Sequence, residues 1–278
     1  MSSGDYVRLR SPENILEEIK DLAQAYPDIR EFYLEVETFG VDIPWALDLC
    51  SKLEAFNKSL PSPLGFGTNL RITPNADLEN IFRMMERCNF KFINIGLESG
   101  SDKVRAGILK RHYSNEDIVK AVRLARAHGI KVIFQILIGI PGETPADFEE
   151  TIQITRRCRP NSYILSIFFP YPGTELYEVV RRNGLIKGGL DTRNERMRPA
   201  LNLPGFKKKE IMSNYIWFEY NIYKGYKPLY EIMDRVITAQ LKSMPATSFI
   251  LDMLLENGYI RSLKNRIKSI IHKKAAKF

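Results

Sequence analysis

The sequence predicts an α/β fold built on a parallel sheet, followed by a helical extension. Strand-like and helix-like segments alternate in five consecutive β-to-α units, and helical crossovers of this kind join parallel strands. Two of the strand-like segments, VIFQILI and YILSIFF, are almost wholly apolar, which is typical of strands covered on both faces. These patterns alone fit a barrel and an open doubly wound sheet equally well.

Periodicity and end signals predict the individual elements. The chain begins with a helix at SPENILEEIKDLAQAY, where Ser11 is the N-cap and the apolar side chains share one face. The strands are expected at EFYLEV, LGFGTNLRI, FINIGL, KVIFQILIG and SYILSIFF. The helices after them are expected at IPWALDLCSKLEAF, NADLENIFRMMERC, SNEDIVKAVRLARAHG, PADFEETIQITRRC and GTELYEVVRRNG. Ser114 and Asp117 stand in capping-box positions.

The regular alternation stops near Gly188, which divides the chain into three predicted parts. Residues 1–187 form the α/β core, 188–206 an irregular connection rich in breakers, and 207–278 a helical, basic extension. The first part of the extension contains a dense aromatic stretch: Tyr215, Trp217, Phe218, Tyr220, Tyr223, Tyr226 and Tyr230. Packing of this helix against the core is favoured over a substrate-binding wall.

Composition places the chain among ordinary globular proteins. It has 278 residues, 44% hydrophobic and 27% charged, and no segment approaches the roughly 18 apolar residues of a membrane-spanning helix. The start, MSSGDYVRLRS, lacks the apolar run of a secretory signal, so a cytoplasmic protein is expected. Cys50, Cys88 and Cys158 are too far apart for a chelating or redox motif and are expected in the core.

The net charge of +8 is concentrated at the C-terminal end. No acid follows Glu256, whereas seven Lys and Arg residues do, so the rest of the chain is nearly neutral. Within 259–278 an apolar stripe opposes the basic residues, as in helices that lie on a membrane surface. A solvated helix packed on the core is the alternative. Nucleic acid is disfavoured because aromatic side chains are not interleaved with the basic ones.

Polar residues and glycines stand at the ends of all five predicted strands, where parallel α/β folds bind ligands. They include Glu35, Glu37, Thr38, Thr68, Asn69, Arg71, Glu98, Ser99, Ser101, Gly139, Gly142 and Thr144. The acid in FINIGLESGSDKV, Glu98, could equally begin a helical turn, but its place among several polar strand ends favours function. In GIPGET, Thr144 is expected to cap the next helix, which leaves the backbone able to contact a ligand.

Four segments in this order resemble radical S-adenosylmethionine (radical SAM) enzymes, particularly those that also carry a cobalamin-binding domain. The segments are INIGLESGSDKV, SNEDIVKAVRLARAHGIKV, ILIGIPGETPADFEETI and FFPYPGTELYE. YVRLRSPENILEEI and LEVETF also resemble that subgroup, and the resemblance covers about residues 6 to 186. It implies a partial TIM-like (β/α)6 barrel that here lacks its first strand.

The resemblance also implies cofactors and binding residues. In the family, S-adenosylmethionine lies across the strand ends, chelates a 4Fe-4S cluster and yields a 5′-deoxyadenosyl radical. Glu37 and Thr38 match the region near the methionine amino group, and Arg71, Glu98 and Ser99 match polar positions that face the cofactor. The backbone of two further segments would flank the adenosine, at Ile138, Gly139 and Gly142 and at Phe169 and Tyr171.

The sequence departs from the family at the cluster motif. The CxxxCxxC cysteines and the first strand are both absent, so no residue is assigned as a metal ligand or as catalytic. A truncated and inactive chain is expected. A fragment, a misplaced start codon and a split gene with a separate N-terminal module are the open explanations, and cobalamin would be bound through an absent upstream domain.

The expected parent reaction is radical methylation or rearrangement of an unknown small-molecule or lipid-like substrate. The alternatives are a non-catalytic barrel that binds S-adenosylmethionine or a partner, and a membrane-surface protein led by its basic tail.

Overall fold

Five parallel strands form one sheet in the computed structural model, which describes residues 9–36, 39–74, 76–186 and 190–244. Their spatial order is their sequence order, and each strand pairs in parallel with the next. The strands are β1 (Glu31–Leu34), β2 (Gly65–Leu70), β3 (Phe90–Glu98), β4 (Lys131–Ile138) and β5 (Ser162–Ile167). The predicted α/β class and all five predicted strands are confirmed.

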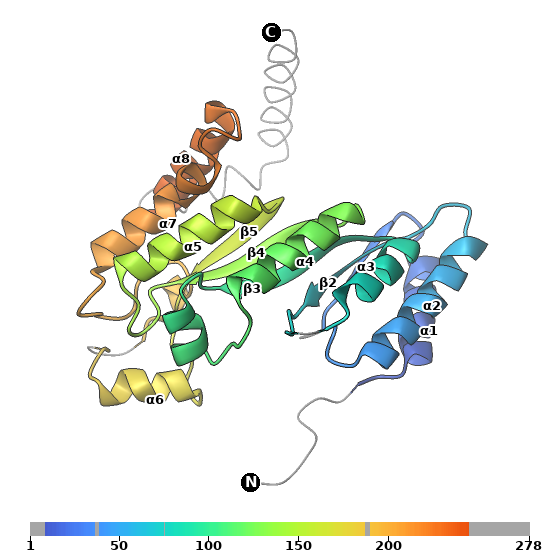
Figure 1. The fold of residues 1–278 in the computed structure, drawn as a ribbon, viewed down its shortest axis with the longest axis horizontal. Helices are drawn as coiled ribbons and strands as arrows, with labels where there is room; N and C mark the ends of the chain where they lie inside the picture. The colour runs from blue at the N-terminus through green and yellow to red at the C-terminus, as the bar shows by residue number, and fades with distance from the viewer. Residues whose placement is uncertain (1–8, 37–38, 75, 187–189, 245–278) are drawn as a thin grey trace.

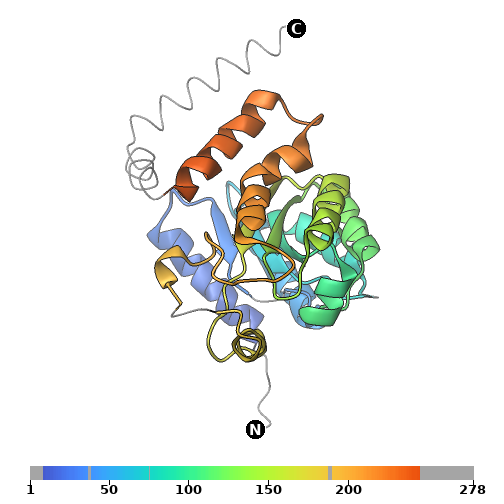
Figure 2. The ribbon, with the colours of Figure 1, turned by 90° about the vertical axis from the view of Figure 1, so that its left-hand side faces the viewer.

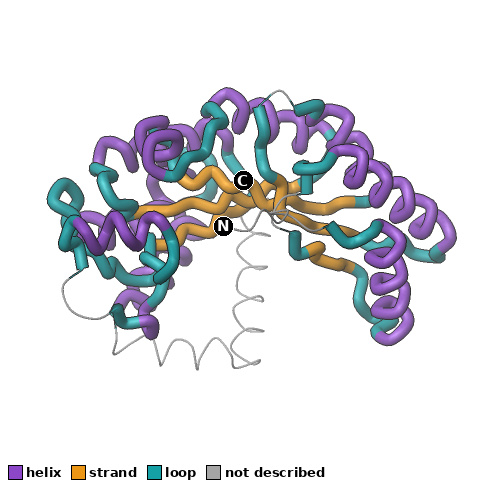
Figure 3. The backbone as a smooth tube through the Cα atoms, turned by 90° about the horizontal axis from the view of Figure 1, so that it is seen from below, coloured by secondary structure: helices purple, strands orange, loops and turns teal. Residues whose placement is uncertain are grey.

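The sheet curls into half of a barrel, with its helices on the convex side and the strands on the inside of the arch (Figure 3). Along β3, Ile93, Ile95 and Leu97 are fully buried under helices, whereas Phe92 and Asn94 face the concave side and stay partly exposed. The partial barrel is therefore the correct one of the two architectures.

Helices connect the strands around the outside of the arch (Figure 1). They are α2 (Ile43–Ser59), α3 (Leu78–Arg87), α4 (Asn115–Ala127) and α5 (Pro145–Cys158). In addition, α1 (Pro12–Ala25) precedes β1 and α6 (Glu175–Arg182) follows β5. Ser11 caps α1, and complete capping boxes begin α4 at Ser114 and α5 at Thr144. These sequence signals are confirmed. A turn of π-helix at Lys103–Ile108 was not predicted.

The C-terminal extension begins with the helical hairpin α7 (Lys208–Tyr223) and α8 (Leu229–Ser243), which Figure 2 shows side by side at the β5 edge of the sheet. Phe218 is fully buried, with its ring centroid 5.7 Å from Phe148 and 4.9 Å from Tyr163. Aromatic side chains of α7 therefore pack against the core, as expected, although Trp217 remains 42% exposed.

The proposed membrane-facing segment, 259–278, lies outside the described residues. Within the described residues, no helix combines the length and the apolar character that crossing a bilayer requires.

Candidate functional site

Glu98 lies at an irregularity at the end of β3. The register with β4 shifts between Gly96 and Glu98, and Glu98 has a φ of 57°, a left-handed conformation that non-glycine residues rarely adopt. The absence of a side chain at Gly96 makes room for the carboxylate, since a Cβ there would lie 2.6 Å from Glu98 Oε1. The alternation that puts Phe92 and Asn94 on the concave side puts Glu98 there too, and its carboxyl lies over Gly96.

The Glu98 carboxyl is half-buried and makes no hydrogen bond or ion pair with any described residue. Burial raises its pKa, and the nearby Arg111 guanidinium partly opposes that shift. A carboxyl with vacant acceptor positions in such surroundings is suited to a ligand that donates hydrogen bonds.

Glu98 lines a cavity of about 340 Å³ at the carboxyl ends of β3, β4 and β5. Apolar and aromatic side chains supply much of its wall: Ile108, Leu109, Leu137, Phe168, Phe169, Tyr171 and Leu176. Phe169 is buried and stands edge-on to Tyr171, with ring centroids 5.2 Å apart. The polar part of the wall includes two carboxylates, Glu98 and Glu175, of which Glu175 is paired with Lys110, so Glu98 is the carboxylate left for a ligand with an apolar part.

A second cavity, of about 530 Å³, lies beside Arg71 and the loops that follow β1 and β2. Arg71 is exposed and has no hydrogen bond or ion pair within the described part of the chain. Tyr113 also lines this cavity and donates a hydrogen bond to Gly96 O at 2.6 Å. Because Gly96 is two residues before Glu98 on β3, this hydrogen bond links the Arg71 cavity to the strand end that carries Glu98. Burial and then the charge of Glu98 raise the pKa of Tyr113.

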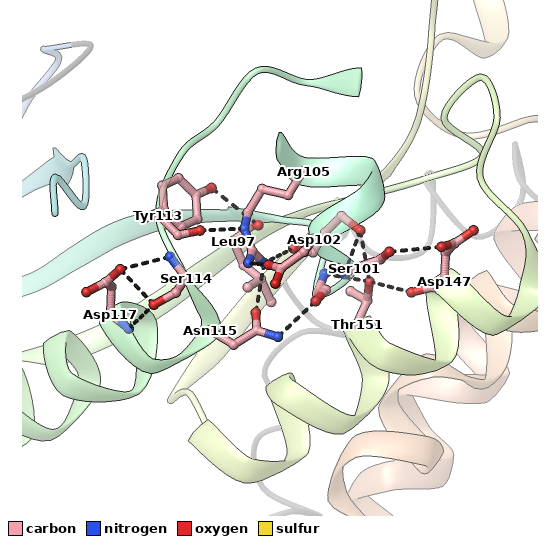
Figure 4. Close-up of polar contacts among 12 residues, drawn as sticks. Leu97, Ser101, Asp102, Arg105, Tyr113, Ser114, Asn115, Asp117, Asp147 and Thr151 are labelled. Atoms are coloured by element: carbon pink, nitrogen blue, oxygen red, sulfur yellow. Dashed lines mark hydrogen bonds and ion pairs between the residues drawn. The ribbon is translucent and has the colours of Figure 1, made fainter. Parts of the chain in front are cut away.

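Buried Arg105 fixes the loop that joins β3 to α4 (Figure 4). Its guanidinium donates to the backbone oxygens of Ser99 and Tyr113, each at 2.8 Å, and to Asn115 Oδ1 at 2.7 Å. It also pairs with Asp102. Because this loop carries Arg111 and Tyr113, Arg105 holds one wall of each cavity in place.

Ser99 faces away from the Glu98 cavity. Its hydroxyl is fully buried, lies 3.4 Å from Thr151 Oγ1 on α5 and accepts a hydrogen bond from the Ser101 backbone. The Ser101 hydroxyl in turn donates to Asp147 at 2.8 Å. These hydrogen bonds attach the segment that follows β3 to α5. A direct ligand contact of Ser99 stays a prediction.

The loop after β4 is organised around Glu143, which the sequence interpretation did not single out. Its carboxylate accepts from the backbone N–H groups of Gly139, at 2.6 Å, and Ile140, at 3.2 Å. Its Oε1 is buried without a hydrogen-bond partner among the described residues, and burial raises the pKa of Glu143 to about 8. The sequence signal for this role was the spacing: Glu143 follows Gly139 by four residues and Ile140 by three, close enough for its side chain to reach back to their N–H groups.

The structure therefore brings together some of the predicted site residues. Glu98, Phe169 and Tyr171 line one cavity and Arg71 lines its neighbour. Ile138 ends β4 and is buried, and Gly139 and Gly142 adopt positive φ angles of 81° and 84° in the turn that follows. Glu37 and Thr38 lie outside the described residues. Arg105 and Tyr113 are contributors that sequence reasoning missed.

The cysteines do not fit an iron-sulfur cluster. Cluster irons are held by thiolates that meet at one point, whereas Cys50, Cys88 and Cys158 are each at most 3% exposed and belong to the outer helix layer. Burial raises the pKa of Cys158 to about 11, which disfavours the thiolate. Among the described residues, no group of three or more His, Cys, Asp or Glu side chains could hold a metal ion.

Comparison with curated proteins finds relatives that share part of their length with this chain. A tRNA-2-methylthio-N(6)-dimethylallyladenosine synthase of Moorella thermoacetica is 28% identical over 60% of this chain and 38% of its own length. An uncharacterized methyltransferase of Pyrococcus horikoshii is 24% identical over 75% of this chain and 44% of its own length. The chain thus spans less than half of either relative.

Solved structures share the fold at low sequence identity. The cobalamin-dependent S-adenosylmethionine radical enzyme OxsB with aqua-cobalamin bound has a TM-score of 0.59 and 16% identity, over 92% of this chain and 47% of its own. The radical S-adenosylmethionine methyltransferase TsrM of Kitasatospora setae has a TM-score of 0.54 and 20% identity, over 65% of this chain and 33% of its own. The model of the Radical SAM superfamily matches residues 2–154. Since that match covers more than half of the chain, this protein belongs to the radical SAM superfamily.

Proposed function

We propose that the rim of this half-barrel binds S-adenosylmethionine, with the adenosine in the Glu98 cavity and the methionine carboxylate facing Arg71. The observation that carries the proposal is the Glu98 carboxyl, which is half-buried, lacks hydrogen-bond partners among the described residues and lies beside an apolar wall. Family membership supports it, because S-adenosylmethionine and a 4Fe-4S cluster are the cofactors of radical SAM enzymes.

Each part of the ligand would meet a complementary group. The ribose hydroxyls would donate to Glu98, whose ionised form Arg111 favours. Phe169 and Tyr171 would lie against the adenine and exclude water from it. Arg71, which has no ion-pair partner within the described residues, would receive the carboxylate.

The cluster would be held by cysteines that this sequence does not contain, next to a strand that pairs with β1. Among the described residues β1 pairs with β2 alone, and Glu31 and Tyr33 on it are exposed. An unpaired parallel edge accepts a further strand readily, and the family barrel suggested by the sequence has one strand before this one. We therefore expect this chain alone to bind S-adenosylmethionine without cleaving it, as a non-catalytic barrel would.

The reaction of the completed enzyme would be a radical methylation or rearrangement. The names of the relatives include tRNA-modifying synthases and an anaerobic magnesium-protoporphyrin IX monomethyl ester cyclase, so they support no single substrate class. Cobalamin, which is bound in some structures of similar fold, would reach this chain through a separate domain.

Isothermal titration calorimetry with S-adenosylmethionine tests the proposal. We expect saturable binding at one site, with competition by S-adenosylhomocysteine. Anaerobic incubation with iron, sulfide and a reductant should yield no 5′-deoxyadenosine from this chain alone. Absence of binding to the folded chain would refute the cofactor site, whereas cleavage by the chain alone would refute the requirement for cysteines that this sequence does not contain.

Contact of 259–278 with a membrane surface remains a second proposal, supported by the apolar stripe opposite basic residues in that segment. Vesicles containing anionic lipid should carry the full chain upward in a flotation gradient but leave behind a variant that ends at residue 258. Equal flotation of both proteins would refute it.

A further inference from the structure

A polar cavity separate from the rim lies where the α7–α8 hairpin meets the amino end of β5. It has a volume of about 100 Å³. Its lining residues come from three segments: Asn161, Ser162 and Tyr163 at the start of β5, Glu219 and Tyr223 on α7, and Lys227 and Arg235 from the turn and α8. The Glu98 cavity lies at the opposite, carboxyl end of the strands.

Hydrogen-bond donors outnumber acceptors among the side chains of this cavity. Ser162 supplies a hydroxyl, and the amide oxygen of Asn161 already accepts from the Val132 N–H at 2.9 Å, which leaves its NH₂ group as the available end. Burial, the Glu219 charge and a hydrogen bond with Glu219 raise the pKa of Tyr163, so its phenol stays protonated and is engaged by that carboxylate, which leaves Asn161 and Ser162 as the uncharged donors. Uncharged groups of this kind commonly complete an anion site.

The net charge of the residues that line this cavity also favours an anion. Lys227 and Arg235 contribute two positive charges and Glu219 one negative charge, which leaves one positive charge in excess. Lys227 Nζ is already held, 3.1 Å from Glu219 Oε1 and 3.2 Å from the centre of the Tyr223 ring. Arg235 makes no hydrogen bond or ion pair within the described residues, although its charge acts on both Tyr163 and Tyr223. Arg235 is exposed, and its guanidinium, which has no protein partner among the described residues, borders a cavity lined mainly by donors.

We propose that this cavity binds a small oxyanion, with inorganic phosphate as the best match and a carboxylate as the alternative source of the same chemistry. A guanidinium pairs with either group through two parallel hydrogen bonds. The volume corresponds to about three water molecules at roughly 30 Å³ each, which is enough for one such anion. Bound there, the anion would connect α8 to β5 and hold the extension against the sheet.

Thermal unfolding of the full chain, titrated with sodium phosphate, tests this site. Sodium chloride keeps the ionic strength constant, so that general screening does not contribute. A ligand that binds only the native state raises the melting temperature in a saturable manner. We expect this rise for the wild type, a loss of affinity of about tenfold or more for Arg235→Gln, and wild-type behaviour for Arg123→Gln, an exposed cation on α4.

If Arg235→Gln is itself less stable, its melting temperature no longer reports on anion binding alone. Phosphorus NMR then measures binding of phosphate to the folded protein directly. Line broadening of phosphate by the folded wild type, absent with Arg235→Gln at a temperature where both are folded, would support the site. Repeating the thermal titration with sodium acetate distinguishes the two kinds of anion. If acetate raises the melting temperature as much as phosphate does, the site binds a carboxylate; if its effect is weaker, the site binds phosphate. No saturable response to either anion, or an equal response in Arg235→Gln, would overturn the proposal, whether or not the rim binds S-adenosylmethionine.

Discussion

Two glutamates at adjacent strand ends have different roles: Glu98 is the last residue of β3, and Glu143 lies in the turn after β4. Glu143 is 1% exposed and accepts two backbone hydrogen bonds from its own turn. Glu98 is half-buried, lines a cavity and accepts none from the described residues. Burial raises the pKa of both acids. The comparison teaches that a strand-end acid held by the backbone N–H groups of its own turn supports the fold, whereas one that lines a cavity and meets no such group is free to bind a ligand.

The largest expected effect concerns Glu143 and pH. The folded-state pKa of Glu143 is about 8, whereas a glutamate in the unfolded chain has an ordinary pKa of 4.5, so the native state binds more protons than the unfolded state between these values. Stability should therefore fall as pH rises through that window, by about 5 kcal/mol in total at roughly 1.4 kcal/mol per pKa unit. Urea denaturation from pH 5 to pH 9 measures the slope.

The matched variants for this prediction are Glu143→Gln and Glu150→Gln. The first should remove most of the slope, because a glutamine still accepts from the turn but does not ionise. The second changes an exposed acid on α5 and should leave the slope unchanged. Parallel pH profiles for wild type and Glu143→Gln would show that the buried carboxyl does not control this dependence.

The next largest effect is expected at Arg105, which holds in place the loop beside Glu98. Arg105→Met should lower the free energy of unfolding by about 3 kcal/mol, because the oxygens of Ser99 and Tyr113 lose a buried donor at ~1–3 kcal/mol each. Affinity for S-adenosylmethionine should fall as well, since the loop bears Arg111. Denaturation and calorimetry measure both, with the exposed Arg123→Met as control. If a folded Arg105→Met protein bound S-adenosylmethionine with unchanged affinity, this loop would not contribute to the binding site.

The smallest effect on stability is expected at Gly96. A Cβ in Gly96→Ala would meet the end of the Glu98 side chain at 2.6 Å, so the carboxylate must move while its chemistry is retained. The flexible side chain should keep the cost near 1 kcal/mol, yet calorimetry should detect weaker binding of S-adenosylmethionine. Gly107→Ala is the control, because a Cβ there has nothing within 4 Å. Equal affinities in the two variants would argue that the position of Glu98 is unimportant.

Sequence periodicity was sufficient for the strands, the connecting helices and the caps at Ser114 and Thr144, because these depend on neighbouring residues. Glu98 could be named as a polar residue after an apolar strand. The burial of Arg105 could not be predicted, because its acceptors are carbonyl groups that only the folded loop brings together. Nor could the sequence distinguish Glu143 from Glu98, since that depends on which backbone N–H groups each carboxylate meets.

The most direct test of this account compares the affinity of S-adenosylmethionine for the wild type, Glu98→Gln and Glu143→Gln by calorimetry at one pH. The account predicts a loss of about tenfold to 100-fold for Glu98→Gln, because hydrogen bonds to a charged acceptor contribute ~1.5–3 kcal/mol each. Glu143→Gln should bind nearly as the wild type does. Undiminished binding by Glu98→Gln, or an equal loss in both variants, would contradict the assignment of Glu98 to the ligand and Glu143 to the fold.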